Sequence, residues 1–184
     1  MLPEQELGDF FTSHFTHTAF RLELLPEYAV GTDGSDFQRW LDGAKEPTWE
    51  RKNAFLDDLR ADREAGRRNS RVKVMSARPT DYERYACEWG YALNAEFEDI
   101  RVLDLASTAL PEPLQGLQDF WLLDDAHVLV MHYDERGRFL GGKIAPDAEL
   151  SRYQAAQRAA EAAAESFPTW WARRTDLRRP RQVA

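Results

Sequence analysis

The stretch Arg71-Val-Lys-Val-Met75, together with the two segments that follow it, decides the fold class. Its charged and apolar residues alternate with the period of two that is typical of a half-buried strand. Pro79 then opens a segment through Leu93 whose aromatic residues recur at helical spacing, and Ile100-Arg-Val-Leu-Asp-Leu105 has the composition of another strand. A strand, a helix of about fifteen residues and a second strand predict a right-handed parallel β-α-β crossover.

Working outward from this unit, the same periodicities extend over most of the chain. Strands are expected at 18–25, 120–123, 128–133 and 138–144, the last three joined by turns at Asp124-Asp-Ala-His127 and Asp134-Glu-Arg-Gly137. Helices are expected at 7–15, 37–43, 47–66 and 147–167. The predicted fold is therefore α/β, bordering on α+β: a mixed sheet with a β-α-β unit, an antiparallel meander and a long C-terminal helix.

Composition predicts one soluble domain at residues 1–171, followed by a basic and flexible tail at 172–184. A chain of 184 residues with 43% hydrophobic residues can bury a core of its own. Its single cysteine, Cys87, permits no internal disulfide, and its first residues have no signal-peptide pattern. These features favour the cytoplasm. The net charge of −8 argues against sequence-specific nucleic-acid binding, and no apolar stretch is long enough for a membrane span.

Three blocks of sequence carry a family resemblance. They are His17-Thr-Ala-Phe-Arg-Leu-Glu23, then Arg71 to Ser76 with Glu98-Asp-Ile-Arg101, then Asp119-Phe-Trp-Leu-Leu-Asp-Asp125 through His132-Tyr-Asp-Glu-Arg-Gly-Arg-Phe-Leu-Gly141. Together they resemble an actinobacterial domain family without an assigned function, whose genes often lie beside those of helix-turn-helix regulators. The resemblance implies a regulatory or protein-interaction role.

The order of elements also resembles the fold of the phospholipase D superfamily. Active members of that superfamily carry a His-x-Lys-x4-Asp motif, which this chain lacks, so the resemblance implies no shared catalysis. Nucleotide-binding glycine loops and the common hydrolase and metalloprotease motifs are absent from the sequence as well. No cofactor is predicted.

Several polar residues form a candidate pocket, though each also has a structural interpretation. Arg21 and Glu23 share one strand face, where they either coat a solvated sheet or join Arg101 in binding an anionic ligand. His132 and Asp134 suit acid-base chemistry, or else they end a strand and cap its turn. The full candidate set is Arg21, Glu23, Arg101, Trp121, Asp124, His132 and Asp134.

A second candidate surface lies near the C-terminus. Trp170, Trp171, Arg173 and Arg174 either dock a protein partner or, in the case of the tryptophans, cap the core. His14 and His17 lie three residues apart but have no further ligand at a metal-binding spacing, so no metal site is predicted.

These observations leave two functional hypotheses. The first is a non-catalytic regulator or adaptor that binds a protein partner, such as a helix-turn-helix regulator. The second is a small-molecule-binding protein or biosynthetic enzyme that uses the polar pocket. They differ in whether the candidate pocket residues converge.

Overall fold

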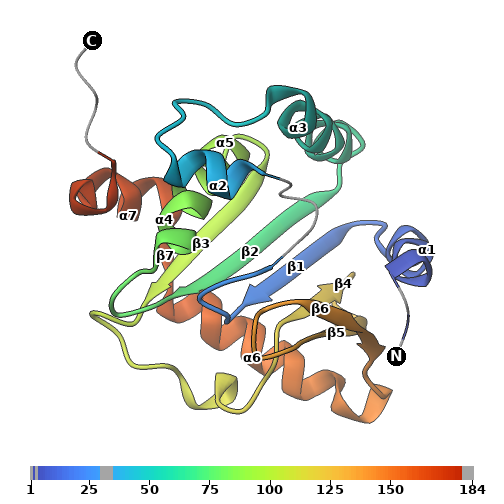
Figure 1. Ribbon diagram of the computed structural model, residues 1–184. Helices are drawn as coiled ribbons and strands as arrows, with labels where there is room; N and C mark the ends of the chain where they lie inside the picture. The colour runs from blue at the N-terminus through green and yellow to red at the C-terminus, as the bar shows by residue number, and fades with distance from the viewer. Residues whose placement is uncertain (1, 3, 30–34, 180–184) are drawn as a thin grey trace.

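The computed structural model describes residues 2, 4–29 and 35–179 of the chain. Within these residues the strands form one seven-stranded mixed sheet in the order β6-β5-β4-β1-β2-β3-β7 (Figure 1). The strands are β1 (Thr18–Glu23), β2 (Arg68–Met75), β3 (Glu98–Asp104), β4 (Phe120–Leu123), β5 (His127–Tyr133), β6 (Phe139–Ile144) and β7 (Glu165–Ser166). The sheet mixes parallel and antiparallel pairs, which confirms the predicted α/β class.

Helices lie on both faces of this sheet. The α-helices are α1 (Glu4–His14), α2 (Asp36–Leu41), α3 (Trp49–Glu64), α4 (Asp81–Tyr85), α5 (Ala92–Asn94), α6 (Leu150–Ala163) and α7 (Phe167–Arg173). Between α4 and α5 runs a π-helix, η2 (Ala86–Tyr91), and short 3-10 turns are η3 (Glu112–Leu114), η4 (Asp147–Glu149) and η5 (Thr175–Leu177). None of the described helices is both long and apolar enough to cross a bilayer.

The parallel half of the sheet is built by two successive crossovers. β1 pairs with β2 and β2 with β3, both in parallel, so the β-α-β unit predicted from residues 71–105 is confirmed. The first crossover contains α2 and α3, and the second contains α4, η2 and α5. Both crossovers step in the same direction along the sheet. Right-handed connections then place all of these helices on one face, which we call the crossover face.

The antiparallel half contains the predicted meander of β4, β5 and β6. Asp124 and Asp125 both have positive φ, at 50° and 55°, and Ala126 donates a backbone hydrogen bond back to Leu123. Because Leu123 pairs with His127, residues 124–126 form the short loop of a β-hairpin. β4 also pairs with β1, which joins the two halves into a continuous sheet.

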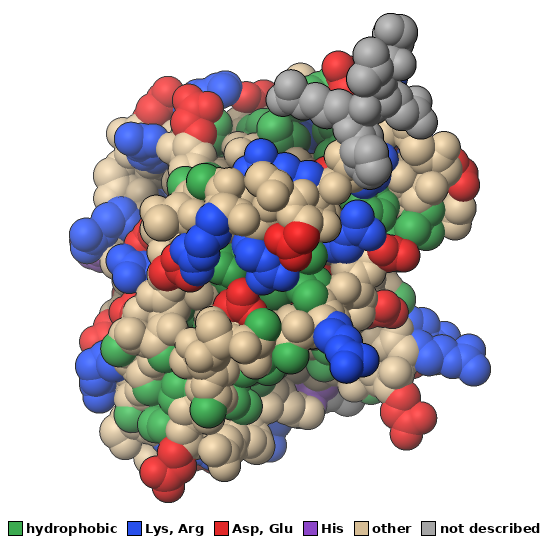
Figure 2. All heavy atoms as spheres, turned by 90° about the vertical axis from the view of Figure 1, so that its left-hand side faces the viewer, with side chains coloured by type: hydrophobic (Ala, Val, Ile, Leu, Met, Phe, Trp, Pro, Cys, Tyr) green, Lys and Arg blue, Asp and Glu red, His purple; other side chains and the backbone are tan. Residues whose placement is uncertain are grey.

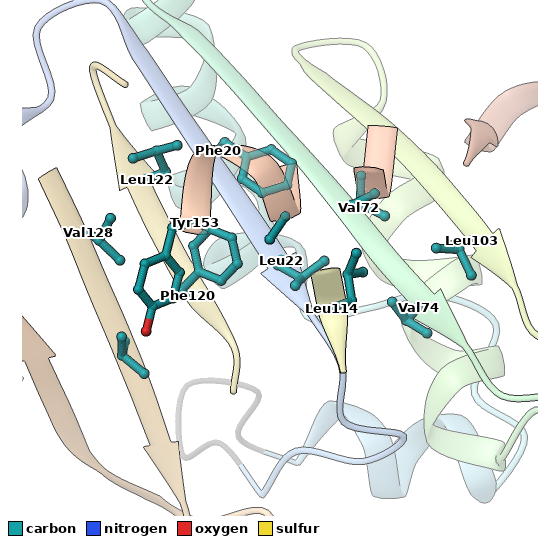
Figure 3. Packing of buried hydrophobic residues seen from close by; sticks show 13 residues of the cluster. Phe20, Leu22, Val72, Val74, Leu103, Leu114, Phe120, Leu122, Val128 and Tyr153 are labelled. Atoms are coloured by element: carbon teal, nitrogen blue, oxygen red, sulfur yellow. The ribbon is translucent and has the colours of Figure 1, made fainter. Parts of the chain in front are cut away.

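The main hydrophobic core lies on the opposite face, beneath α6. Alternate residues of the central strands, among them Phe20, Leu22, Val72 and Leu122, point toward this helix (Figure 3). The helix contributes Tyr153 together with small alanines that allow close packing against the sheet. Because Leu22 has no exposed surface, replacing it with alanine should cost about 2–5 kcal/mol.

The C-terminal region differs from the prediction in two respects. The expected helix over 147–167 ends at Ala163, because Glu165 and Ser166 pair with the edge of β3 before α7 begins. Residues 172–179 of the expected flexible tail pack against the body, with Leu177 buried. Residues 180–184 lie outside the described part of the chain.

Candidate ligand-binding site

The crossover face of β1 and β2 carries charge where a core would ordinarily be apolar. Residues next to each other in the register share a face, and the register pairs Arg21 with Arg71 and Glu23 with Lys73. Phe20, Leu22 and Val72 face the other way, into the core under α6. The strict alternation of these two strands thus collects four charged side chains at the centre of the sheet.

Glu23 is the anion that holds two of these cations together. Its Oε1 atom accepts hydrogen bonds from Nε of Arg21 at 2.9 Å and from Nη1 of Arg71 at 2.7 Å. Its Oε2 atom accepts the Tyr91 hydroxyl at 2.6 Å. Burial alone would raise the pKa of Glu23, but Arg71, Arg21 and Lys73 outweigh it and lower the pKa to about 2. Glu23 is therefore ionised throughout the neutral range.

The π-helix brings Tyr91 to this carboxylate. A capping box starts the helical segment, since the Thr80 hydroxyl accepts the backbone N–H of Glu83 while the Glu83 side chain accepts that of Thr80. The helix then widens over Ala86–Tyr91. Such π-segments are rare and are frequent at functional sites. Here four π-helical residues, Ala86, Trp89, Gly90 and Tyr91, border the cavity described below.

A second layer of polar groups fixes the two arginines from their outer sides. Nη2 of Arg21 donates to the Tyr133 hydroxyl at 3.1 Å, and Nε of Arg71 donates to Glu98 at 2.8 Å. Asp119 lies 3.9 Å from Nη2 of Arg21, and burial raises the pKa of this aspartate. Each guanidinium is thereby anchored on two sides while remaining near the sheet surface.

A cavity of about 400 Å³ opens above these arginines, between the sheet and the helices of the crossover face. Its charged lining comprises Arg21, Glu23, Asp36, Arg51, Lys52 and Arg71. Its aromatic lining comprises Tyr28, Phe55, Tyr82, Tyr85, Trp89, Tyr91 and Trp121. Four basic and two acidic side chains give the lining an excess of positive charge, whereas the whole chain carries −8. The volume suits a small organic molecule.

Both arginines keep hydrogen-bond donors that the described residues do not use. Nη1 of Arg21 and Nη2 of Arg71 form no hydrogen bond within the described structure, although each guanidinium has five N–H donors. Among the described residues, the one fully buried side-chain nitrogen or oxygen without a partner is Nε2 of His132. Because neither arginine nitrogen belongs to that fully buried class, each keeps some exposed surface, and both arginines line the cavity.

Three residues of the pocket predicted from the sequence lie at this cavity, and four do not. Arg21, Glu23 and Trp121 line it, with the Arg21 guanidinium 5.0 Å from the centre of the Trp121 ring. Arg101 is in register with Val72 and so points to the opposite face, where it pairs with Asp99. The predicted pairing of Arg101 with Arg21 and Glu23 is wrong, because strand β3 presents its odd-numbered residues to the other side.

The remaining three predicted pocket residues have structural roles. Asp124 accepts hydrogen bonds from the backbone N–H groups of His17 and Thr18, at 2.7 and 2.8 Å, so it fixes the start of β1. Asp134 accepts those of Arg136 and Arg138, both at 2.9 Å, and caps the β5–β6 turn. Both arrangements lower the pKa of the aspartate.

His132 occupies the β5 position opposite Gly141, in phase with the core residues Val128 and Val130. Its neighbour Tyr133 reaches Arg21 instead, because adjacent strand residues point to opposite faces. The residue at this strand end that joins the site is thus the tyrosine rather than the histidine.

Sequence reasoning missed Arg71, Tyr91, Tyr133 and Lys52 as site residues. Arg71 carries a partial signal, since alternation assigns it to the face of its strand opposite Val72, while the register decides that this face meets Arg21. Tyr91 carries none. In an uninterrupted α-helix the Tyr91 side chain would point in a different direction from the aromatic side chains before it. The π-helix changes this angular offset.

The predicted docking residues near the C-terminus are largely integrated into the fold. Trp170 has no exposed surface, and its indole N–H donates to Asp104 at 2.8 Å. Trp171 stacks on Phe167, with ring centres 5.8 Å apart. Arg173 forms an ion pair with Glu165, and Arg174 forms one with Asp104. Trp170 therefore caps the core, which is the structural alternative that the sequence left open.

His14 and His17, the two histidines considered as metal ligands, contact different neighbours. His14 contacts the ring of His127 at 4.4 Å between centres, while His17 lies beside Asp124. Among the described residues, no group of three or more His, Cys, Asp or Glu side chains is arranged to hold a metal ion. Cys87 is fully buried, and burial raises the pKa of its thiol.

Comparison with known families matches residues 5–172 to a domain of unknown function, DUF6879. The chain belongs to the DUF6879 family. The match spans the sheet and all of its covering helices, so the charged cavity lies wholly inside the DUF6879 domain. No curated protein and no solved structure matches the chain. The chemistry of this DUF6879 protein therefore has to be argued from its own cavity.

Proposed function

We propose that this protein binds a small anionic organic molecule in the cavity above β1 and β2. The observation that carries the proposal is the pair of adjacent arginines, Arg21 and Arg71, which both line a cavity whose described lining has more basic than acidic side chains. Planar guanidinium groups are suited to recognising carboxylate and phosphate oxygens through paired hydrogen bonds. Within a chain of net charge −8, this local excess favours an anion as the occupant.

The arginine pair is also held ready for a ligand. Register partners of like charge on adjacent strands repel each other, so this pair is unfavourable unless anions compensate it. Glu23 supplies part of that compensation by bridging both guanidiniums. A ligand oxyanion above them would add a second bridge. It would gain from side chains whose rotamers are already fixed, which reduces the entropic cost of binding.

A charge reversal on α3 tests this function with a matched control. Arg51 lines the cavity, whereas Arg60 lies on the same helix and pairs with Asp57; the two side chains are 42% and 50% exposed. Arg51→Glu and Arg60→Glu change the net charge equally, and neither residue is in the core. A library of small organic anions, cations and neutral molecules is screened by thermal shift against both variants and the native protein.

The expected result is that anions raise the melting temperature of the native protein and of Arg60→Glu but have a much smaller effect on Arg51→Glu. Binding at a hundred times Kd stabilises a protein by about 2.7 kcal/mol, which is a readily measured shift. Equal responses of the two variants would contradict the proposal, as would a library in which only cations or neutral molecules stabilise the protein.

A protein partner is a second candidate function, and one surface feature favours it. Leu140 and Ile144 are 54% and 45% exposed on β6, the last strand on its side of the sheet, and they flank Gly142, whose backbone exchanges hydrogen bonds with Leu2. Exposed apolar residues on a sheet edge suit pairing with another chain. On this view the partner is a helix-turn-helix regulator, as the resemblance of the sequence blocks implies. Co-purification with the neighbouring regulator should then be abolished by lysine at both positions, and an unchanged complex would exclude this edge.

A further inference from the structure

Resting on the proposed function, we infer that the anion is an aromatic carboxylic acid, whose carboxylate binds Arg21 and Arg71 and whose ring lies against the aromatic wall of the cavity. Two features of the cavity support this ligand. The floor offers two guanidinium groups on adjacent strands, and the walls are dominated by aromatic side chains.

The wall consists of rings that already contact one another. Tyr28 lies 6.0 Å from Tyr82, Tyr82 lies 5.7 Å from Tyr85, and Tyr85 lies 5.9 Å from Trp89, all measured between ring centres. These rings are tilted or edge-on to each other, and the ring of a bound aromatic acid would extend the same arrangement. Aromatic pairs prefer such offset and edge-to-face arrangements. A saturated polar ligand would make no comparable use of this wall.

The described part of the lining shows neither of the usual means of binding a phosphate group. Phosphates commonly sit on backbone N–H groups at a helix N-terminus or a glycine-rich loop. Among the described residues, the lining contains one glycine, Gly90, and it lies within the π-helix. The end of the crossover loop that leads into α3 already has a carboxylate, because Asp36 accepts hydrogen bonds from the Thr48 N–H and hydroxyl groups. The free donors are those of guanidinium groups, whose fork matches the two oxygens of a carboxylate.

The charge of the lining excludes the opposite type of ligand. An aromatic wall can also bind a cation through the faces of its rings. Arg39, which does not line the cavity, already lies 5.9 Å from the Trp89 ring centre, and Asp36 is compensated by Arg39 at 2.7 Å and by Arg51 at 3.7 Å. Among the described lining residues, an incoming cation would meet more basic than acidic side chains and no carboxylate that lacks a cationic partner. An aromatic acid would meet an open guanidinium pair.

The test is isothermal titration of the native full-length protein with a set of matched probes. Phenylacetate and indole-3-acetate carry both required groups. Phenylacetamide lacks the charge, acetate lacks the ring, and phenyl phosphate replaces the carboxylate with a phosphate. We expect both aromatic acids to bind at least about tenfold more tightly than phenylacetamide, acetate and phenyl phosphate, the tenfold ratio being about 1.4 kcal/mol.

Two variants locate the binding site without disturbing the arginine network. A Cβ atom added at Gly90 would meet no atom within 4 Å, so Gly90→Leu should fold and fill the cavity. Phe55 lines the cavity, whereas Trp49, on the same helix, does not, and the two are 43% and 41% exposed. Gly90→Leu and Phe55→Ala should weaken phenylacetate binding at least about tenfold and about threefold respectively, and Trp49→Ala should leave it unchanged.

The outcomes distinguish a failure of the aromatic-carboxylate inference from a failure of the anion-binding function. If phenyl phosphate or acetate binds as tightly as phenylacetate, the aromatic carboxylate is overturned while the anion-binding function stands. If no anion binds, the proposed function fails as well. Binding of the aromatic acids that Gly90→Leu and Phe55→Ala leave unchanged would place the site elsewhere and overturn the inference.

Discussion

Replacing Glu23 with glutamine removes the one anion shared by the two arginines. The glutamate side chain is 7% exposed and accepts three side-chain hydrogen bonds, from Arg21, Arg71 and Tyr91. Glutamine keeps the shape of glutamate but carries no charge. Its amide N–H group would also stand opposite one of the three groups that donate to Glu23. Breaking a buried ion pair by removing one partner typically costs about 3–5 kcal/mol, because the other charge stays buried.

The pKa of Glu23 gives an independent figure for the same interaction. Its reduction from 4.5 to about 2 corresponds to roughly 3 kcal/mol of stability at neutral pH. Because the folded-state pKa is lowered, this stability is fully present above pH 4.5 and is lost as the pH falls from there toward 2. The cost of Glu23→Gln should therefore be greatest near pH 7 and should shrink below pH 4.5.

Urea unfolding followed by tryptophan fluorescence measures this cost at pH 7 and at points between pH 5 and 3. A loss of about 3 kcal/mol corresponds to a melting temperature roughly 6–12 °C lower in a chain of this length. Glu50→Gln, an exposed position on α3, is the matched control and should change stability by less than about 0.5 kcal/mol. A Glu23→Gln variant as stable as this control, or a cost that grows with acidity, would refute the network as a stabilising unit.

Three further substitutions test other parts of the fold, with the free energy of unfolding in urea as the measurement. Gly137→Ala should cost about 1–3 kcal/mol, because the position has a φ of +73° and an added Cβ atom would lie 2.6 Å from a backbone oxygen; a neutral effect would show that the loop can move. Trp170→Phe should cost about 1–3 kcal/mol by removing a donor from buried Asp104, and a smaller change would mean that this bond is dispensable. Arg179→Ala should cost about 1–2 kcal/mol through its lost bonds to Glu88 and to two backbone carbonyls, and no change would show that this segment is not docked.

The architecture was largely predictable because its determinants are local. The alternation at Arg71–Met75 and the turn at Asp124-Asp125 each encode their own geometry, and both are confirmed. The end of α6 was not predictable in this way. Helix-forming alanines continue through Ala164, and the helix stops because Glu165 and Ser166 find hydrogen-bonding partners on β3, which the local sequence does not reveal.

The candidate site was only partly predictable because it depends on which strands become neighbours. Arg21 and Glu23 could be assigned to one face by alternation alone, as the structure has them. Whether a charge on another strand shares that face depends on the register, and a shift of one residue reverses the answer. Arg71 falls on the charged face and Arg101 on the core face. Both are strand arginines, and nothing in their own segments distinguishes them.

The charged side chains of the exposed surface are arranged differently from those of the cavity lining. On the face shown in Figure 2, Lys and Arg side chains are interspersed with Asp and Glu side chains, and no broad basic surface appears there. The described lining of the cavity has four basic and two acidic side chains. Under the proposed function, such an arrangement would select a ligand by enclosure and by pairing with guanidinium groups, since exposed mixed charges are screened within about 10 Å at ordinary salt.

Stability and recognition are coupled through Glu23, and this coupling distinguishes an anion site from an ion network that only stabilises the fold. In a purely structural network, an added anion should have no preferred position, and neutralising Glu23 should only weaken the fold. In a binding site, Glu23→Gln removes the negative charge between Arg21 and Arg71, so a bound carboxylate can supply part of the lost charge compensation. The aromatic acids should then raise the melting temperature of Glu23→Gln more than that of the native protein. An equal or smaller rise would leave the arginines with a structural role alone.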